Sequence, residues 1–411
     1  MDKERRSMEQ WDVIIVGAGI AGISAARTLA EGPRRRVLLV NGESVVPYKR
    51  TKLSKHIADG EPAARFALES DAWYANHGIE LRTGAAVAAI DTAGHTVTLN
   101  DGSMHRYAKL ILATGARPLY PPSLARSQER FPDSFHVVRE SVDIDRLRSA
   151  AARARRVLIG GMGVLAVETA AELHQLGKRV TMVGAGNQLM PRHLNPRSAE
   201  LLEEMLGARE ISLRFGEEIL GVEPVDKGGY RVELIRDAVK TDMIVVCVGV
   251  EPYIDLARDS GLSVARGIVV DDRLMTSAPD VYAAGDCAEH DGGVLTDLWH
   301  AAEYQGVVAA TNASGGDAVW DGRPFRLKCE VFGSYLLSIN KPREVDGLEI
   351  VEHERDGVYQ CFYFDGPMLS GAVMVDDFAR AKAYQTAVQE RWSRDRVVEH
   401  FLSDSPTPGD S

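Results

Sequence analysis

The sequence predicts an α/β protein built on parallel β-sheets, because one pattern of apolar segment, glycine-rich turn and helical segment occurs twice. The first copy runs from the apolar segment Trp11–Val16 into glycines at positions 17, 19 and 22. The second runs from Arg156–Gly160 into Gly161 and Gly163, with Ala166 at the third position. Between a strand and a helix, G-x-G-x-x-G is typical of a Rossmann-like dinucleotide-binding fold. Two such turns predict two dinucleotides in one chain.

Each residue of the first turn has an expected role. Gly17 permits the tight turn, Gly19 lets backbone N–H groups approach a pyrophosphate, and Gly22 lets the following helix pack closely. That helix is expected over residues 20–31, with its N-terminus toward the phosphate. Glu43 follows Gly22 by 21 residues, close to the spacing expected of an acid that binds ribose hydroxyls.

The second turn departs from this pattern at its ribose position. The next strand, Arg179–Val183, is followed by Gly184-Ala-Gly186, so the expected acid at position 184 is missing and neither neighbour replaces it. The nearest cations that could receive a 2′-phosphate are Arg192 and His193, several residues further on. NADH and NADPH both stay open as the second dinucleotide.

A third group of apolar segments is expected to return to the first sheet. These segments are Ile244–Val250, Gly267–Val270 and Asp280–Asp286. The last ends in Gly285-Asp286, where a carboxylate can hydrogen-bond a polyol such as the ribityl chain of a flavin. An ordinary strand-ending turn is the alternative interpretation.

The glycines and acids of these segments, taken in their order along the chain, resemble those of the FAD-dependent pyridine nucleotide oxidoreductase superfamily. The resemblance rests on Gly17, Gly19 and Gly22, Ala113-Thr114-Gly115, Gly161 and Gly163, Gly249, and Gly285-Asp286. Two segments narrow it: Pro47-Tyr48-Lys-Arg50-Thr-Lys-Leu53-Ser54-Lys55 is similar to a box of ferredoxin and rubredoxin reductases, and Leu298–Gly306 resembles their flavin-flanking helix. Leu189–Leu194 and Phe325–Lys328 are similar to NADH-rubredoxin reductases and to the flavoprotein module of nitrite reductases.

The resemblance implies FAD on the first fold and NADH or NADPH on the second. It implies cofactor contacts from Gly17, Gly19, Gly22, Glu43, Arg50, Lys55, Val87, Ala113, Thr114, Gly115, Gly161, Gly163, Ala166, Glu168, Gly249, Gly285, Asp286 and Trp299. It further implies that Lys55 and Glu168 form a charged pair beside the flavin ring and act as catalytic residues, with Trp299 at the pyrimidine edge. Glu168 is expected on a helix among apolar neighbours, where an isolated charge would be costly.

Composition limits the function classes. The chain has 411 residues, 45% of them hydrophobic, and a formal net charge of −11, which argues against nucleic acid and against an anionic membrane as partners. Its four cysteines form no C-x-x-C pair, so neither a redox dithiol nor a metal centre is expected. Cysteines this sparse favour a reducing cytoplasm. Where disulfide-reducing and peroxide-reducing relatives carry a cysteine near the flavin, this chain has Ser54-Lys55-His56.

The expected domain organisation is discontinuous. An FAD domain comprises residues 12–117 and 242–315, an NAD(P)H domain of residues 119–241 is inserted in it, and a C-terminal α+β domain spans 319–402. In the last, strands are expected over 331–337, 349–351, 359–364 and 371–375, followed by a helix, and residues 403–411 are expected to be a disordered tail. This domain is expected to form either a homodimer face or an acceptor-docking wall.

The expected function is an FAD-dependent NAD(P)H oxidoreductase that delivers electrons to a small iron protein, rubredoxin first and a [2Fe–2S] ferredoxin second. The basic residues Lys49, Arg50, Lys52, Lys55 and His56 form a candidate docking surface for such an acidic partner. Two alternatives stay open. One is an NAD(P)H oxidase that reduces oxygen, and the other is a nucleotide-responsive sensor similar to apoptosis-inducing factor.

Overall fold

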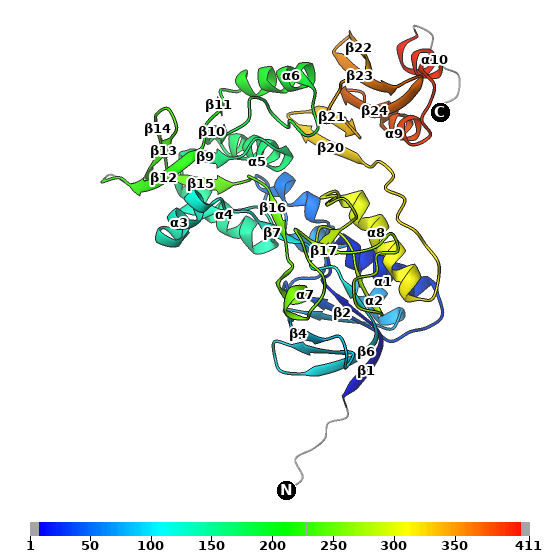
Figure 1. Cartoon of the computed structure of the whole chain (residues 1–411). Coiled ribbons are helices and arrows are strands. Elements are labelled where there is room, and N and C mark those ends of the chain that lie inside the picture. Colours follow the sequence, from blue (N-terminus) through cyan, green and yellow to red (C-terminus); the bar gives the residue numbers. More distant parts are fainter. Residues whose placement is uncertain (1–7, 227, 404–411) are drawn as a thin grey trace. The chain divides into compact units, whose positions relative to one another are not determined.

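The structure is a computed structural model that describes residues 8–226 and 228–403. These residues divide into two compact units, shown with their elements in Figure 1. The first unit comprises the chain up to Leu119, a short segment Arg139–Asp145, and Val250–Asp321. The second comprises Tyr120–Val138, Arg146–Gly249, and the chain from Gly322 onward.

The first unit is organised by a seven-stranded sheet with a parallel centre. Strands β1, β2, β3, β6 and β18 pair in parallel, while β4 and β5 extend one edge in antiparallel pairing. In spatial order the strands are β3 (Ile79–Thr83), β2 (Val37–Asn41), β1 (Glu9–Val16), β6 (Met104–Leu112), β5 (Thr96–Leu99) and β4 (Val87–Asp91), with β18 (Val281–Ala283) beside β6. Strands β2 and β18 are wholly buried, as strands covered on both faces should be, and β1 and β6 become apolar and buried toward their C-terminal ends.

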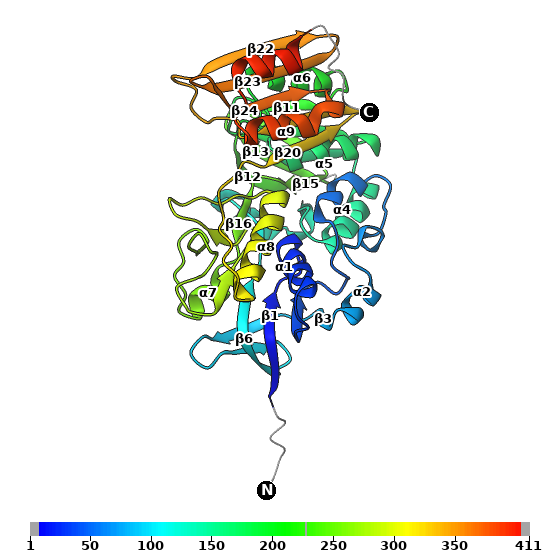
Figure 2. The same ribbon diagram turned by 90° about the vertical axis from the view of Figure 1, so that its right-hand side faces the viewer.

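Two helices of this unit pack against each other at very short range. Helix α1 (Ile20–Glu31) lies beside α8 (Trp299–Ala313), as Figures 1 and 2 both show. A Cβ placed on Gly306 of α8 would lie 2.2 Å from the Ala21 carbonyl oxygen, so only glycine permits this approach. The other helices of this unit are α2 (Asp71–Asn76) and α7 (Asp255–Asp259), with the short helices η1 (Arg50–Lys52), η2 (Ser54–His56) and η3 (Ala63–Phe66). Two further strand pairs are β7 (Ala116–Pro118) with β16 (Val250–Pro252), and β17 (Ile268–Val269) with β19 (Ala288–Glu289).

The second unit contains its own five-stranded parallel sheet. Its strands are β11 (Ser212–Phe215), β10 (Arg179–Gly184), β9 (Arg156–Gly160), β15 (Met243–Val246) and β8 (Phe135–His136) in spatial order. An antiparallel sheet follows β11 in the chain and consists of β12 (Ile219–Pro224), β13 (Tyr230–Leu234) and β14 (Ala238–Thr241). The helices are α3 (Pro122–Arg130), α5 (Val164–Gln175), α6 (Pro196–Gly207) and η4 (Pro132–Ser134), together with α4 (Ser141–Arg153), whose residues up to Asp145 belong to the first unit.

The C-terminal part of the second unit is a five-stranded antiparallel sheet with helices on one side. The order is β20 (Arg326–Val331), β21 (Ser334–Ile339), β24 (Met368–Val375), β23 (Val358–Asp365) and β22 (Glu349–Arg355), followed by η5 (Phe378–Arg380), α9 (Ala381–Gln389), α10 (Arg394–Val397) and a π-helical turn at Val398–Leu402. Tyr384 of α9 is fully buried and stacks on Phe401 with ring centroids 4.3 Å apart. Its hydroxyl donates to the Asp377 carboxylate at 2.5 Å, so this aromatic core also satisfies its polar atoms.

The structure corrects two expectations about element placement. Residues 242–249 were expected in the FAD domain, but β15 pairs with β9 and so belongs to the second sheet. The strand expected over 331–337 is interrupted by a hairpin turn, because Phe332 and Gly333 both have positive φ, 52° and 86°. Of the tail expected to be disordered, residues 404–411 lie outside the described residues.

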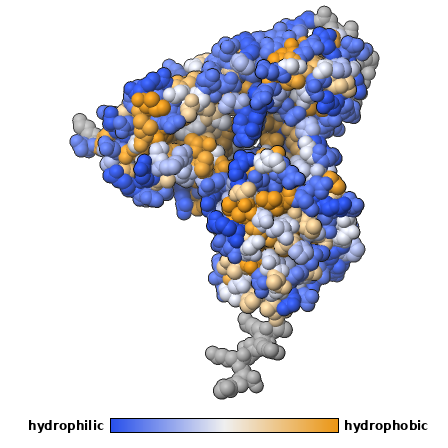
Figure 3. All heavy atoms as spheres, in the orientation of Figure 1, coloured by the Kyte–Doolittle hydropathy of each residue, from blue (hydrophilic) through white to orange (hydrophobic). Residues whose placement is uncertain are grey.

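The surface mixes polar and apolar side chains. On the face visible in Figure 3, apolar residues appear in several separate groups among hydrophilic ones. Among the described residues, no helix is long and apolar enough to cross a membrane.

The second and third glycines of the first turn give a test of this packing. A Cβ on Gly22 would lie 2.0 Å from the Gly17 carbonyl oxygen, whereas a Cβ on Gly19 would have no neighbour within 4 Å. We expect Gly22→Ala to cost about 1–3 kcal/mol through overpacking and to lower the thermal midpoint of the FAD-free protein. Gly19→Ala is the matched control and should leave that midpoint nearly unchanged. Equal midpoints for the two variants would contradict the close approach.

Candidate functional site

The first glycine turn is closed on one side and open on the other. The Gly17 N–H donates to the Val40 carbonyl at 2.8 Å, and a Cβ on Gly17 would lie 2.1 Å from the Ala113 carbonyl oxygen. Gly17 also has φ of 104°, which favours glycine. A Cβ on Gly19, the N-cap residue of α1, would lie in open space. A pyrophosphate therefore fits at Gly19, on the N-terminal side of α1.

Glu43 is held in a dense set of hydrogen bonds. Tyr48 donates its hydroxyl to Glu43 Oε2 at 2.8 Å, Arg50 donates Nη2 to Oε1 at 2.8 Å, and the Ser141 N–H donates to Oε2 at 3.2 Å. Burial raises the pKa of Tyr48 well above its usual value, so this phenol stays a donor. The Glu43 carboxylate is thus fixed near the end of β2, where the ribose of a dinucleotide is expected.

Arg139 connects other predicted flavin contacts to the hydrogen bonds around Glu43. Its Nη2 lies 3.2 Å from the Asp286 Oδ2, and its backbone carbonyl accepts a hydrogen bond from Arg50. A Cβ on Gly115, whose φ is 71°, would lie 3.3 Å from the same guanidinium. Arg50, Gly115 and Asp286, which are far apart in the sequence, therefore meet around Arg139.

Sequence reasoning missed Arg139 and Ser141. Both belong to the segment Arg139–Asp145, which lies in the first unit although it was expected in the NAD(P)H domain. A usable signal was the change from the apolar residues Val137 and Val138 to the charged residues Arg139 and Glu140, because binding residues often lie on loops held by a rigid scaffold.

A buried pair of side chains supports the Gly285-Asp286 turn. The Gly285 N–H donates to Gln305 Oε1 at 2.6 Å, and Gln305 Nε2 lies 2.8 Å from His290 Nε2. Because the Gly285 N–H must donate, the amide orientation of Gln305 is settled, and His290 Nε2 must accept. Burial lowers the pKa of His290, which favours this neutral, accepting imidazole.

The remaining predicted contacts of the first unit are placed as follows. Thr114 donates its hydroxyl to the Tyr253 carbonyl at 3.1 Å, next to Ala113. Val87 begins β4 and packs partly buried against the core of the unit. Trp299 begins α8, and Lys49 Nζ lies 5.8 Å from the centre of its ring.

The basic residues expected at a docking surface differ in exposure. Lys49 and Lys52 are exposed, while Arg50 and Lys55 are half-buried. His56 is paired with Asp59 at 2.8 Å and stacks on Phe66. The exposed positive charge is therefore concentrated on the two lysines.

The second glycine turn repeats the geometry of the first. The Gly161 N–H donates to the Val183 carbonyl at 2.8 Å, and a Cβ on Gly161 would lie 2.2 Å from the Cys247 carbonyl oxygen. Open space again surrounds the second glycine, Gly163, and Ala166 is fully buried at the third position. Gly249 has φ of 128° and open space where a Cβ would be. A second pyrophosphate fits at Gly163.

Matching hydrogen bonds relate the backbones of the two folds residue by residue. Gly84 donates to the Glu43 carbonyl at 2.8 Å, and Gly216 donates to the Gly186 carbonyl at 2.9 Å. Gly186, two residues after Gly184, therefore takes the backbone place of Glu43, and neither glycine supplies the expected acid. A Cβ on Gly184 would lie 2.5 Å from Met162 Cγ, so a larger residue does not fit there without movement of Met162.

Glu168 and Lys55 lie in different units. Glu168 is on α5 of the second unit and is 8% exposed, and Lys55 is on η2 of the first. The burial of Glu168 agrees with its expected place among apolar neighbours. The charged pair between Lys55 and Glu168 stays a prediction.

The cysteines are inert in this structure. All four, Cys247, Cys287, Cys329 and Cys361, are free and buried. Burial raises the pKa of the Cys247 thiol to about 12 and raises that of Cys287, so neither forms a thiolate readily. Within the described residues, no group of three or more histidine, cysteine, aspartate or glutamate side chains could hold a metal ion.

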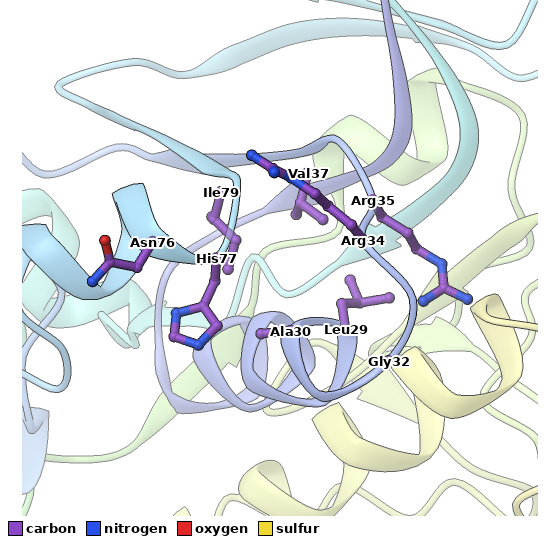
Figure 4. A pocket seen from close by; sticks show the side chains of 9 residues that line it. All are labelled: Leu29, Ala30, Gly32, Arg34, Arg35, Val37, Asn76, His77 and Ile79. Carbon is purple, nitrogen blue, oxygen red and sulfur yellow. The ribbon is translucent and has the colours of Figure 1, made fainter.

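A hollow of about 190 Å³ lies at the opposite edge of the first sheet (Figure 4). It is lined by the end of α1, the starts of β2 and β3, and the side chains of Arg34, Arg35 and His77. Dinucleotides bind outside the carboxyl ends of parallel strands, and this hollow lies at the amino ends. It is also smaller than the roughly 300 Å³ of a typical ligand pocket. We therefore do not assign it to the flavin.

His193 is not the cation that the sequence suggested for a 2′-phosphate. Burial lowers its pKa to about 4, and the charges of Arg192 and Lys341 act in the same direction. A histidine with this pKa is neutral at neutral pH. Of the two residues considered from the sequence, only Arg192 carries a positive charge there.

The low pKa of His193 makes stability depend on pH. As pH falls below about 6.5, the unfolded chain binds a proton that the folded chain binds only near pH 4, so folding becomes less favourable by about 2 kcal/mol at about pH 5. We expect His193→Asn to lose less stability than the unmodified protein between about pH 7.5 and about pH 5 in urea unfolding. His77→Asn, at an exposed position, is the control. The same pH dependence in His193→Asn and in the unmodified protein would contradict this pKa.

Comparisons with known proteins agree with this geometry. The family described as pyridine nucleotide-disulphide oxidoreductase matches residues 11–306. The chain is 29% identical over 387 residues to the NADH-dependent phenylglyoxylate dehydrogenase subunit epsilon of Aromatoleum evansii, covering 91% of this chain and 90% of that one. It is 31% identical over 283 residues to a rubredoxin-NAD(+) reductase of Pseudomonas putida, covering 67% of this chain and 71% of the relative.

A solved structure shares the fold. It is the covalent putidaredoxin reductase–putidaredoxin complex, with a TM-score of 0.83, 24% identity and coverage of 94% of both chains. The family match spans both glycine turns and Gly285-Asp286. The chain therefore belongs to the pyridine nucleotide-disulphide oxidoreductase family.

Proposed function

We propose that the chain is an FAD-dependent NAD(P)H oxidoreductase that passes electrons from a nicotinamide nucleotide through the flavin to a small iron protein. The observation that carries this proposal is the glycine turn built twice, each closed against a neighbouring strand at its first glycine and open at its second. Two open turns in one chain are the arrangement needed to hold an electron donor and a flavin together.

The first fold supplies the FAD contacts. Glu43 would accept hydrogen bonds from the adenosine ribose, and Asp286, fixed by Arg139, would accept them from the ribityl chain. When bound there, FAD would supply the redox chemistry, namely hydride acceptance from nicotinamide and single-electron transfer. Lys55 would stabilise negative charge beside the ring, and the N-terminus of α8 at Trp299 would do so at the pyrimidine edge.

The donor and acceptor follow from the relatives and from charge. NADH is favoured as donor because a relative that aligns over most of the chain is named NADH-dependent. Rubredoxin is the first candidate acceptor, since another relative is a rubredoxin-NAD(+) reductase, and a [2Fe–2S] ferredoxin is the second. Exposed Lys49 and Lys52 offer an acidic acceptor a positive surface.

Four free buried cysteines agree with a reducing cytoplasm as the location.

Anaerobic stopped-flow absorbance tests this function. The purified flavoprotein is mixed with NADH or NADPH, and oxidised rubredoxin or ferredoxin is then added. Rapid flavin bleaching followed by several turnovers of one iron protein is the expected result. Bleaching without onward transfer to either iron protein would contradict the reductase and would favour an oxidase if oxygen restores the colour quickly, or a sensor if the reduced complex persists.

Lys55 should affect flavin reduction and leave FAD binding intact. Lys55→Met removes the positive charge beside the ring, while the phosphate turn at Gly17–Gly22 is untouched, so we expect reduction by NADH to slow at least about tenfold with FAD still bound. The exposed neighbour Lys52→Met is the matched control and should reduce at the normal rate. Normal reduction kinetics in Lys55→Met would remove the role assigned to Lys55.

Lys52 should affect the acceptor step instead. Lys52→Glu reverses an exposed charge, so we expect kcat/KM for an acidic iron protein to fall about tenfold at low salt. The loss should shrink at about 0.5 M salt, where the Debye length is about 4 Å. Lys240→Glu, an exposed charge reversal on β14, is the control. An effect of Lys52→Glu that does not change with salt would exclude docking by charge at this surface.

A further inference from the structure

In the second fold, the residues at the expected adenosine position have no side chains that could hydrogen-bond the ribose. Gly186 stands where Glu43 stands in the first fold, and the preceding residues are Gly184 and Ala185. In dinucleotide folds, an acid here receives the ribose hydroxyls of NAD, whereas a nearby arginine accommodates the 2′-phosphate of NADP. The coenzyme preference must therefore depend on residues from a neighbouring element.

The neighbouring element is the turn that follows β11. Its backbone is bonded directly to the bare segment, because Gly216 donates to the Gly186 carbonyl at 2.9 Å and Glu217 donates to the Gly184 carbonyl at 3.0 Å. The side chain of Glu217 is fully buried at this point. Side chains anchored on this turn are thus fixed beside the expected ribose position.

Glu217 anchors Arg236. Arg236 Nε donates to Glu217 Oε1 at 2.7 Å, and the Arg236 backbone N–H donates to Oε2 at 3.2 Å. Arg236 Nη2 also donates to the Phe215 carbonyl. These two side-chain bonds engage two of the five N–H donors of a guanidinium, which leaves donors for a phosphate.

The antiparallel sheet explains how residues so far apart in sequence meet. Ile219 at the start of β12 pairs with Leu234 at the end of β13. Residues just before β12 and just after β13 are therefore neighbours, which brings Arg236 over Gly216. The nearest guanidinium nitrogen lies 3.9 Å from the position of a Cβ on Gly216.

The exposed charge of this cluster is positive. The Arg236 side chain is 63% exposed, whereas that of Glu217 is 0% exposed beneath it. Burial alone would raise the pKa of Glu217, but the hydrogen bonds from Arg236 outweigh it and hold the pKa below its usual value. A second arginine, Arg214, lies 3.8 Å from Glu217 and 2.5 Å from Asp237. The guanidinium is therefore the exposed charge at Gly216, next to Gly186, and the Glu217 carboxylate lies buried beneath it.

We propose that Arg236 determines coenzyme choice by donating hydrogen bonds to the 2′-phosphate of NADPH, so that the chain accepts NADPH as well as NADH. Glu217 is a positioning residue that holds the guanidinium over the turn. This inference rests on the proposed role of the second unit as the nicotinamide nucleotide fold.

Nucleotide binding tests it without electron transfer. Isothermal titration calorimetry of the FAD-loaded protein is carried out with adenosine 2′,5′-bisphosphate and with 5′-AMP, which lacks only the 2′-phosphate. We expect the bisphosphate to bind at least about tenfold more tightly, equivalent to about 1.4 kcal/mol. Arg236→Gln should remove this preference and leave 5′-AMP binding unchanged. Arg231→Gln, an exposed arginine at the other end of β13, should preserve the preference.

Two further variants separate positioning from folding. Arg236→Lys keeps the charge but not the planar fork, so it should keep part of the preference. Glu217→Gln should weaken bisphosphate binding more than 5′-AMP binding, with the thermal midpoint recorded to show that the protein is folded.

The inference is overturned if the unmodified protein shows no preference for the bisphosphate, or if Arg236→Gln weakens both nucleotides equally. If 5′-AMP binds while the preference is absent, the nucleotide fold of the proposed function stands and only the role of Arg236 fails. If neither nucleotide binds, the proposed function of this unit fails with it.

Discussion

The structure depends on one close backbone crossing, made once in each unit. At Gly17 and at Gly161, the chain leaves a parallel strand, donates its N–H to the end of the next strand, and passes against the carbonyl of a third. A Cβ at either glycine would lie within 2.2 Å of that carbonyl oxygen. This contact fixes the direction in which the helix starts, and so places open backbone N–H groups where a pyrophosphate can bind.

The two folds keep this crossing but differ at the ribose. In the first, Glu43 provides the acid, and Tyr48, Arg50 and Ser141 hold it. In the second, glycine stands at the equivalent position, and the fixed charges come from Glu217 and Arg236 on the adjoining turn. One acid is therefore partly open to its ligand, while the other is buried and serves to present a guanidinium. The same backbone frame thus supports two nucleotide specificities.

Local patterns were enough to predict the two glycine turns and the FAD and NAD(P)H of the family. Gly17, Gly161 and Gly285-Asp286 each lie directly after a buried strand, so spacing along the chain gives their place in space. Arg139 and Arg236 could not be found in this way. Arg139 reaches the flavin contacts because a short segment rejoins the first unit, and Arg236 reaches the ribose position through the pairing of β12 with β13. Both depend on contacts between distant parts of the sequence.

Burial was the other factor that the sequence did not reveal. His193 looks like a cation next to the second ribose position, but its surroundings lower its pKa to about 4. The backbone equivalent of Glu43 also lies two residues beyond Gly184, the position that was counted from the end of the predicted strand. The hydrogen bond from Gly216 to Gly186 shows which residue corresponds to Glu43.

The most direct test is to block the expected pyrophosphate site of the second turn alone. Gly163 has φ of −84° and no neighbour within 4 Å of a Cβ, so Gly163→Glu should fold normally yet place a carboxylate where the second pyrophosphate binds. The measurement is the flavin content and the flavin absorbance of this variant after addition of NADH, NADPH or dithionite. The account predicts one FAD per chain, bleached by dithionite but not by either nicotinamide nucleotide. Loss of FAD, or normal bleaching by NADH, would contradict the assignment of the two folds.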